Sequence, residues 1–237
     1  MLTDFHSHIL PEMDDGSSSI DESLELLKML TDAGVERVLL TPHFYRSDEN
    51  IQSFLERRQK SYEKLLSAVD TLDKVPELIL GAEVYFYPSL SSDPDFSKLC
   101  IGDTNYMLLE LPFEHLYENF FIDFSKFMNR CSHKILLAHI ERYLKFGNTQ
   151  KEIDRLLSFG GISCQMNCTS LAEASWLQQG KLIKMISNGT INVLGSDAHN
   201  LHRRPPMFKE ALNIINKKCS KDTLDRINAY SNKLLGK

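Results

Sequence analysis

The sequence alternates between short apolar runs and longer amphipathic stretches, and this alternation restricts the chain to few folds. Seven runs rich in Val, Ile and Leu predict strands at Leu2–His6, Val35–Leu40, Glu77–Gly81, Tyr106–Leu111, Lys134–His139, Gly161–Met166 and Ile191–Leu194. Apolar residues at helical spacing predict helices at Ser19–Ala33, Asn50–Asp73, Tyr117–Cys131, Gln150–Phe159, Ser170–Ser187 and Met207–Lys217. Strands that alternate with helices pair in parallel, so the pattern predicts an α/β protein.

The repeated units run through the 237 residues without a break in composition. We therefore expect a single domain over residues 1–237, built on a barrel-like parallel sheet. A doubly wound open sheet is the alternative, since periodicity alone does not distinguish a closed sheet from an open one.

Charge and composition exclude several classes of protein. With 27 basic and 32 acidic residues, the net charge is −5, which gives no electrostatic basis for binding nucleic acid or an anionic membrane. No apolar run is long enough for a transmembrane helix, and MLTDFHSHIL lacks the pattern of a signal peptide. The five cysteines are scattered without a C-x-x-C pair, which is typical of a reducing compartment. We expect a soluble cytoplasmic protein.

Histidines and carboxylates follow six of the seven predicted strands, whereas the sixth strand is followed only by Asn167 and Cys168. In a parallel barrel the loops after the strands converge at one rim. Several buried carboxylates at one rim are costly unless cations neutralise them, so this pattern predicts a metal cluster. The nine candidate ligands are His6, His8, Asp15, His43, Glu83, Glu110, His139, Asp197 and His199.

The donor types indicate the metals and the substrate. Imidazole and carboxylate without thiolate suit Mn, Fe, Zn or Co, and nine ligands suggest two or three ions with a bridging carboxylate. Four carboxylates and three divalent ions leave a charge of about +2, which matches a dianion such as a phosphate monoester. Arg142, Arg203 and Arg204 follow these strand ends and can offer forked contacts to phosphate, although Arg203 is more readily explained as a solvated surface residue.

These residues predict metal-assisted hydrolysis, in which a bridging water with a lowered pKa attacks phosphorus. A thiol phosphatase is excluded, because that mechanism requires an arginine six positions after the nucleophilic cysteine. The residues at that spacing are Tyr106, Leu137, Ser170, Ala174 and Asp225. No P-loop or Rossmann fingerprint is present to bind a nucleotide.

The order of the motifs resembles the PHP superfamily, with H-x-H after the first strand and D-x-H near the C-terminus. More narrowly, DFHSHILPEMDDGS, TPHF, GAEVY, AHIERY and SDAHNLHRRPP are similar to the manganese-dependent protein-tyrosine phosphatases of bacterial capsule and exopolysaccharide loci. The resemblance extends from Asp4 to about Pro206. It implies a distorted (β/α)7 barrel, related to the TIM barrel, with a trinuclear Mn²⁺ site.

The resemblance also implies roles for the candidate residues. One ion would be held by His6, His8, Glu83 and Asp197; Glu83 would bridge to a second ion held by Glu110 and His139; Asp15, His43 and His199 would hold the third. Arg142 and Arg204 would bind the phosphate. His43 and His199 lie near enough for a general acid, although a metal-bound histidine serves poorly in that role.

The resemblance further implies a physiological substrate and setting. The substrate would be a phosphotyrosyl protein, the tail of an autophosphorylated bacterial tyrosine kinase, and the function would be control of capsule synthesis. The enzyme would then be peripheral to a membrane at most through its substrate, and a homo-oligomer is compatible with the family. Two alternatives stay open: a phosphatase of a small metabolite such as histidinol phosphate or a sugar phosphate, and a non-catalytic metal-dependent binding module.

Overall fold

The parallel strand pairing expected from the alternation is present in the structure, a computed structural model that describes residues 1–93 and 96–237. A three-stranded sheet has the order β1-β2-β4, and a six-stranded sheet has the order β3-β5-β6-β7-β8-β9. The strands are β1 (Leu2–Asp4), β2 (Val35–Leu40), β3 (His43–Phe44), β4 (Glu77–Leu80), β5 (Glu83–Tyr85), β6 (Tyr106–Glu110), β7 (Lys134–Leu137), β8 (Ile162–Asn167) and β9 (Val193–Gly195).

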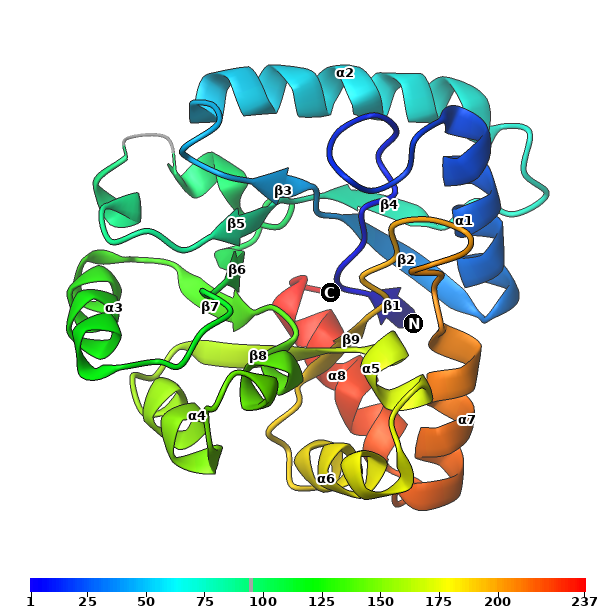
Figure 1. The fold of residues 1–237 in the computed structure, drawn as a ribbon. Helices are drawn as coiled ribbons and strands as arrows, with labels where there is room; N and C mark the ends of the chain where they lie inside the picture. The colour runs from blue at the N-terminus through cyan, green and yellow to red at the C-terminus, as the bar shows by residue number, and fades with distance from the viewer. Residues whose placement is uncertain (94–95) are drawn as a thin grey trace.

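The two sheets join into one curled surface. Between β4 and β5 the chain remains hydrogen-bonded to the segment that links β2 and β3. Gly81 N donates to Leu40 O at 2.9 Å, and Glu83 N donates to Pro42 O at 3.0 Å. At the other margin Phe5 N donates to Leu194 O at 3.0 Å, which brings the chain after β1 against β9. Figure 1 shows these strands at the centre, with helices around them.

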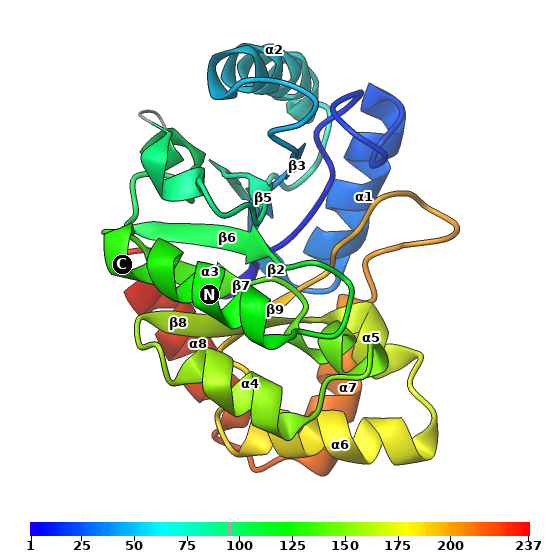
Figure 2. The same cartoon turned by 60° about the vertical axis from the view of Figure 1, so that its left-hand side comes forward.

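The helices cover the outside of the curled sheet, and in Figure 2 the strands lie between α2 on one side and α4 and α6 on the other. The α-helices are α1 (Ile20–Asp32), α2 (Ile51–Val69), α3 (Glu118–Arg130), α4 (Gln150–Leu157), α5 (Cys168–Ala172), α6 (Trp176–Ser187), α7 (Phe208–Lys218) and α8 (Thr223–Leu234). The described residues also form three 3₁₀ turns, η1 (Leu90–Ser92), η2 (Phe96–Leu99) and η3 (Ile140–Lys145). In the described ranges, none of these helices is both long and apolar enough to cross a bilayer.

Local signals explain where the helices begin. The Ser19 hydroxyl accepts from Glu22 N at 3.2 Å, and the Asn50 side chain accepts from Ser53 N at 3.0 Å. Each bond satisfies an N–H that the first turn leaves without a partner. The ranges predicted for these two helices, Ser19–Ala33 and Asn50–Asp73, therefore begin at the capping residues of α1 and α2.

Several predicted boundaries were wrong. The helix predicted at Ser170–Ser187 is two helices, because a new one begins where the Gln178 side chain accepts from Ser175 N at 3.2 Å. The first strand ends at Asp4, before the two histidines. Between β5 and β6 the described chain forms the 3₁₀ turns η1 and η2, so the alternation of strand and α-helix is not strict there.

Helix α8 was not predicted. It packs against β1 and β9, and its Asn232 side chain accepts from the Nη2 of the buried Arg37 at 2.8 Å. Many residues of this segment are polar, so the apolar positions that pack inward are difficult to recognise in the sequence.

The apolar core lies mainly between the sheet and the helices, and α3 contributes the buried phenylalanines Phe121, Phe124 and Phe127. The Phe124 ring lies 5.5 Å from that of Phe86 and 5.3 Å from that of Phe159. Edge-to-face pairs of this kind add to the free energy gained by burying the rings. Helix α3 is thus held to the sheet by aromatic packing.

Replacing Phe124 by Ala should lower the free energy of unfolding by about 3–5 kcal/mol, because it removes a fully buried ring and leaves a cavity. Ile122→Ala, on the exposed face of the same helix, should cost less than about 1 kcal/mol. Equilibrium urea unfolding of both variants measures the difference. Equal losses would show that α3 does not depend on this aromatic packing.

Candidate metal centre

The nine predicted ligands meet at the rim formed by the C-terminal ends of the strands. Glu83 and His43 open the short strands β5 and β3, and Glu110 closes β6. The other six lie in the segments that follow β1, β7 and β9: His6, His8, Asp15, His139, Asp197 and His199. All except His43 and Asp15 are buried.

Glu83 is the centre of the cluster. Its Oε2 lies 3.2 Å from His6 Nε2, 3.3 Å from His8 Nε2 and 2.9 Å from His43 Nδ1, and its Oε1 lies 2.8 Å from His139 Nε2. Burial raises the pKa of this carboxyl, but the surrounding imidazoles outweigh burial and hold the pKa well below its usual range. Glu83 is therefore ionised and faces four imidazoles.

The ligand atoms fall into three overlapping groups. Within each group the ligand atoms lie within 4.8 Å of one another, and the groups are His8, Asp15, His43 and His199; His6, His8 and Glu83; and His43, Glu83 and Glu110. Asp197 Oδ1 lies 3.6 Å from His6 Nε2 and 3.5 Å from His8 Nε2, and Glu110 Oε1 lies 3.4 Å from His139 Nε2. These groups resemble the three predicted ligand sets, but His8 and His43 each belong to two of them.

Hydrogen bonds to the far side of two imidazoles test whether the cluster suits cations. His8 Nδ1 lies 2.7 Å from Asp14 Oδ2, and His199 Nδ1 lies 2.9 Å from the carbonyl of Asp197, so each Nδ1 carries the proton. The Nε2 atoms then face Glu83 and Asp15, at 3.3 and 3.4 Å. An Nε2 without a proton can share a cation with the carboxylate that it faces, so the donor set fits metal ions.

Asp14 was missed as a functional residue, although it stands in the DDG motif. Its Oδ2 also accepts from His43 N at 2.8 Å, and its Oδ1 accepts from Gly16 N at 2.9 Å. The carboxylate thereby orients one candidate ligand and fixes the start of β3. Metal-binding histidines are commonly held in this way, and the hydrogen bond fixes the tautomer and the ring orientation.

Two polar side chains of β8 were also overlooked. Gln165 Oε1 accepts from His139 N at 2.7 Å and lies 3.2 Å from His6 Nδ1. Asn167, for which we predicted no role, accepts from the Gln165 amide and donates to Asp197 Oδ2 at 2.7 Å. Gln165 and Asn167 are two residues apart on one strand, so both side chains lie on the inner face of β8. This spacing is the sequence pattern from which their role could have been predicted.

The backbone around the ligands adopts conformations that require special residues. A Cβ added to Gly195 would lie 2.6 Å from His6 Cβ, so only glycine lets β9 approach this histidine. His139 and Asp197 have positive φ angles of 32° and 54°. Such conformations cost of order 1–3 kcal/mol in a non-glycine residue and persist only where the surroundings enforce them.

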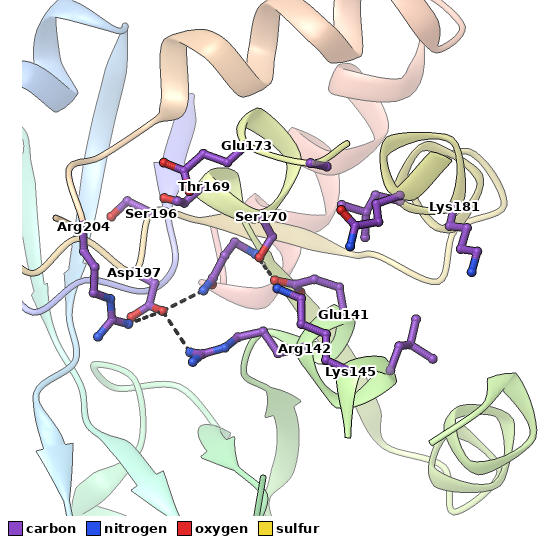
Figure 3. A pocket seen from close by; sticks show the side chains of 15 residues that line it. Glu141, Arg142, Lys145, Thr169, Ser170, Glu173, Lys181, Ser196, Asp197 and Arg204 are labelled. Carbon is purple, nitrogen blue, oxygen red and sulfur yellow. Dashed lines mark hydrogen bonds and ion pairs between the residues drawn. The ribbon is translucent and has the colours of Figure 1, made fainter. Parts of the chain in front are cut away.

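Both predicted phosphate-binding arginines reach the edge of the cluster, as Figure 3 shows. Arg204 Nη2 donates to Asp197 Oδ2 at 2.6 Å, and Arg142 Nη1 lies 3.6 Å from the same oxygen. The Arg142 guanidinium also lies 4.5 Å from the centre of the Phe113 ring, which holds it in place. Arg203 is exposed, as a solvated surface residue would be.

The fold and this site define an α/β protein with a candidate polynuclear metal centre, a class in which hydrolases are common. The chain belongs to the capsular polysaccharide synthesis family CpsB/CapC, whose sequence profile matches residues 2–235. The family resemblance drawn from the motifs is therefore confirmed.

Named relatives have similar lengths to this chain. It is 27% identical to the tyrosine-protein phosphatase CpsB of Streptococcus pneumoniae, over 92% of this chain and 90% of the relative. It is also 27% identical to the tyrosine-protein phosphatase YwqE of Bacillus subtilis, over 91% and 84% of the two chains. A solved structure described with YwqE and CpsB as metal-dependent tyrosine phosphatases aligns with a TM-score of 0.82 and 24% identity, over 100% of this chain and 95% of that chain, which shows the shared fold.

Replacing Asp14 by Ala should weaken Mn²⁺ binding about 10- to 100-fold, because His8 loses the hydrogen bond that orients it. Calorimetric titration of the metal-free protein with Mn²⁺ measures this affinity. Asp21→Ala, at an exposed position on α1, is the matched control and should bind like the unmodified protein. Unchanged affinity in Asp14→Ala would remove this carboxylate from the metal centre.

Proposed function

We propose that the protein is a metal-dependent phosphatase that hydrolyses phosphotyrosine on protein. The observation that carries the proposal is the gathering of imidazole and carboxylate ligands around Glu83, with two arginines at the edge. Membership of a family whose named relatives are tyrosine-protein phosphatases favours this reaction over hydrolysis of a small metabolite and over a non-catalytic metal-binding role.

The nine residues His6, His8, Asp15, His43, Glu83, Glu110, His139, Asp197 and His199 would hold two or three divalent ions. Nitrogen and oxygen ligands without thiolate suit Mn²⁺, and they also accept Fe or Zn. When bound, such ions supply a water of lowered pKa as nucleophile and neutralise charge on the phosphoryl oxygens. Among the residues of the chain, Glu83 has one carboxylate oxygen toward His6, His8 and His43 and the other toward His139, which suits a bridging role.

The two arginines would bind and orient the phosphate. Guanidinium groups match phosphate geometry, and in the transition state the charge spreads over the equatorial oxygens that they would contact. The leaving phenolate of tyrosine has a pKa of about 10, so it departs without full protonation. His43 and His199 are then not required as acids, which agrees with their proposed use as ligands.

We also propose that the curled parallel sheet is a closed barrel. If β2 with β3 and β4 with β5 each count as one interrupted strand, the order runs through seven strands, and the bond from Phe5 to Leu194 joins the last to the first. We describe this as a single domain over residues 1–237 with a distorted (β/α)7 barrel.

The family description supports a role in capsule synthesis, and we propose the phosphorylated tail of a bacterial tyrosine kinase as the substrate. The five cysteines are free, which suits a reducing cytoplasm. The protein would act there as a monomer or a homo-oligomer and meet a membrane only through its substrate.

Chelation should abolish hydrolysis of a phosphotyrosyl peptide, because the chain has no cysteine nucleophile that could replace the metal-dependent mechanism. Mn²⁺ should restore the activity best among divalent ions. His6→Ala should lose both bound metal and turnover. Activity assays with paired metal analysis test both statements. Full activity after verified removal of metal would overturn the mechanism, and a preference below tenfold for the peptide over small monoesters would favour a metabolite phosphatase.

Arg142→Ala should raise KM for the phosphopeptide by about 10- to 100-fold, the effect of losing a hydrogen bond to a charged group. Its metal content should not change, since Arg142 is not among the candidate ligands. Arg203→Ala, at the exposed neighbour of Arg204, is the control and should leave KM unchanged. An unaltered KM in Arg142→Ala would exclude it from phosphate binding.

A further inference from the structure

A cavity of about 390 Å³ extends from the metal centre toward α6, and the proposed reaction assigns it no role. Figure 3 places Asp197 and Arg204 at one end of it and Lys181 at the other. Its walls come from η3, α5, α6 and the segment after β9. The volume is in the range of ligand-binding pockets, and the cavity shares Arg142, Asp197 and Arg204 with the proposed catalytic site.

The carboxylates that line the inner part of the cavity already have partners. Asp197 pairs with Arg204 and accepts from Asn167. Glu141 is buried, and its carboxylate accepts from Asn167 N at 3.2 Å and from the Ser170 hydroxyl, as drawn in Figure 3. Of these two carboxylates, only Asp197 is paired with a cation.

Lys145 at the end of η3 and Lys181 on α6 line the same cavity. Both are exposed, and over residues 1–93 and 96–237 neither forms an ion pair with a carboxylate. Over the whole lining, four cationic side chains stand against three carboxylates: Arg142, Lys145, Lys181 and Arg204 against Glu141, Glu173 and Asp197. The cavity next to the phosphate-binding edge is thus positively charged in a protein whose net charge is −5.

A phosphotyrosine bound at the metal centre has polypeptide on both sides of it, and this polypeptide must leave across the rim. We infer that the cavity binds the segment adjacent to the phosphotyrosine, and that Lys145 and Lys181 pair there with an anionic side chain of the substrate. This inference rests on the proposed function. The anion is the carboxylate of an acidic residue or the phosphate of a second phosphotyrosine, and both offer the same charge-assisted contact.

The test compares matched phosphotyrosine peptides that carry Asp or Asn, in turn, at each of three positions on either side of the phosphotyrosine. A further set carries a second phosphotyrosine at the same positions. An exposed ion pair changes binding by about two- to fivefold, so kcat/KM should favour Asp or phosphotyrosine over Asn by about the same factor at the best position. In the double variant Lys145→Ala/Lys181→Ala this ratio should fall to about one.

Controls separate this inference from the proposed function. Lys184→Ala, at an exposed position farther along α6, should keep the full ratio. Hydrolysis of free phosphotyrosine should be equal in all variants, and its absence from the unmodified protein would overturn the proposed function itself. The lysine subsite is wrong if free phosphotyrosine is hydrolysed but kcat/KM for the Asn peptides equals that for the Asp and the doubly phosphorylated peptides. It is also wrong if the preference for the anionic peptides persists in the double variant.

Discussion

The crowding of carboxylates and imidazoles at one rim is the constraint on which the rest of the structure depends. Glu83 lies within 3.3 Å of four imidazoles and is almost entirely buried. The protons of His8 and His199 are held on the outer nitrogens, by Asp14 and by the Asp197 carbonyl. The inner nitrogens are thereby turned toward carboxylates, and cations bound between the two kinds of ligand would neutralise the buried negative charge.

Much of the local structure serves this arrangement. Gly195 allows β9 to approach His6, and the left-handed backbone at His139 and Asp197 turns these side chains after their strands. The bond from His139 N to Gln165 helps to hold one of these strained positions. Strained backbone conformations of this kind are usual at functional sites, where they position side chains at a cost in stability.

The sequence predicted the strands, and the meeting of the candidate residues at one rim, because both depend on local pattern. Parallel strands bring their C-terminal ends together whatever the details of packing, so a histidine or carboxylate after each strand predicts a shared rim. The family assignment rested on strings such as AHIERY, and the match over residues 2–235 agrees with it. Residues that act by contact across the fold were less accessible: Asp14, Gln165 and Asn167 act through hydrogen bonds to distant chain segments. The break after α5 and the existence of α8 likewise depend on a cap and on tertiary packing.

Anomalous diffraction at the manganese edge, from crystals grown with Mn²⁺, tests the central claim most directly. We expect two or three peaks at the rim, at least two of them bonded to Glu83, with His8 and His199 bound through Nε2. Peaks that avoid Glu83, or a rim without any peak in crystals of protein active with Mn²⁺, would contradict it.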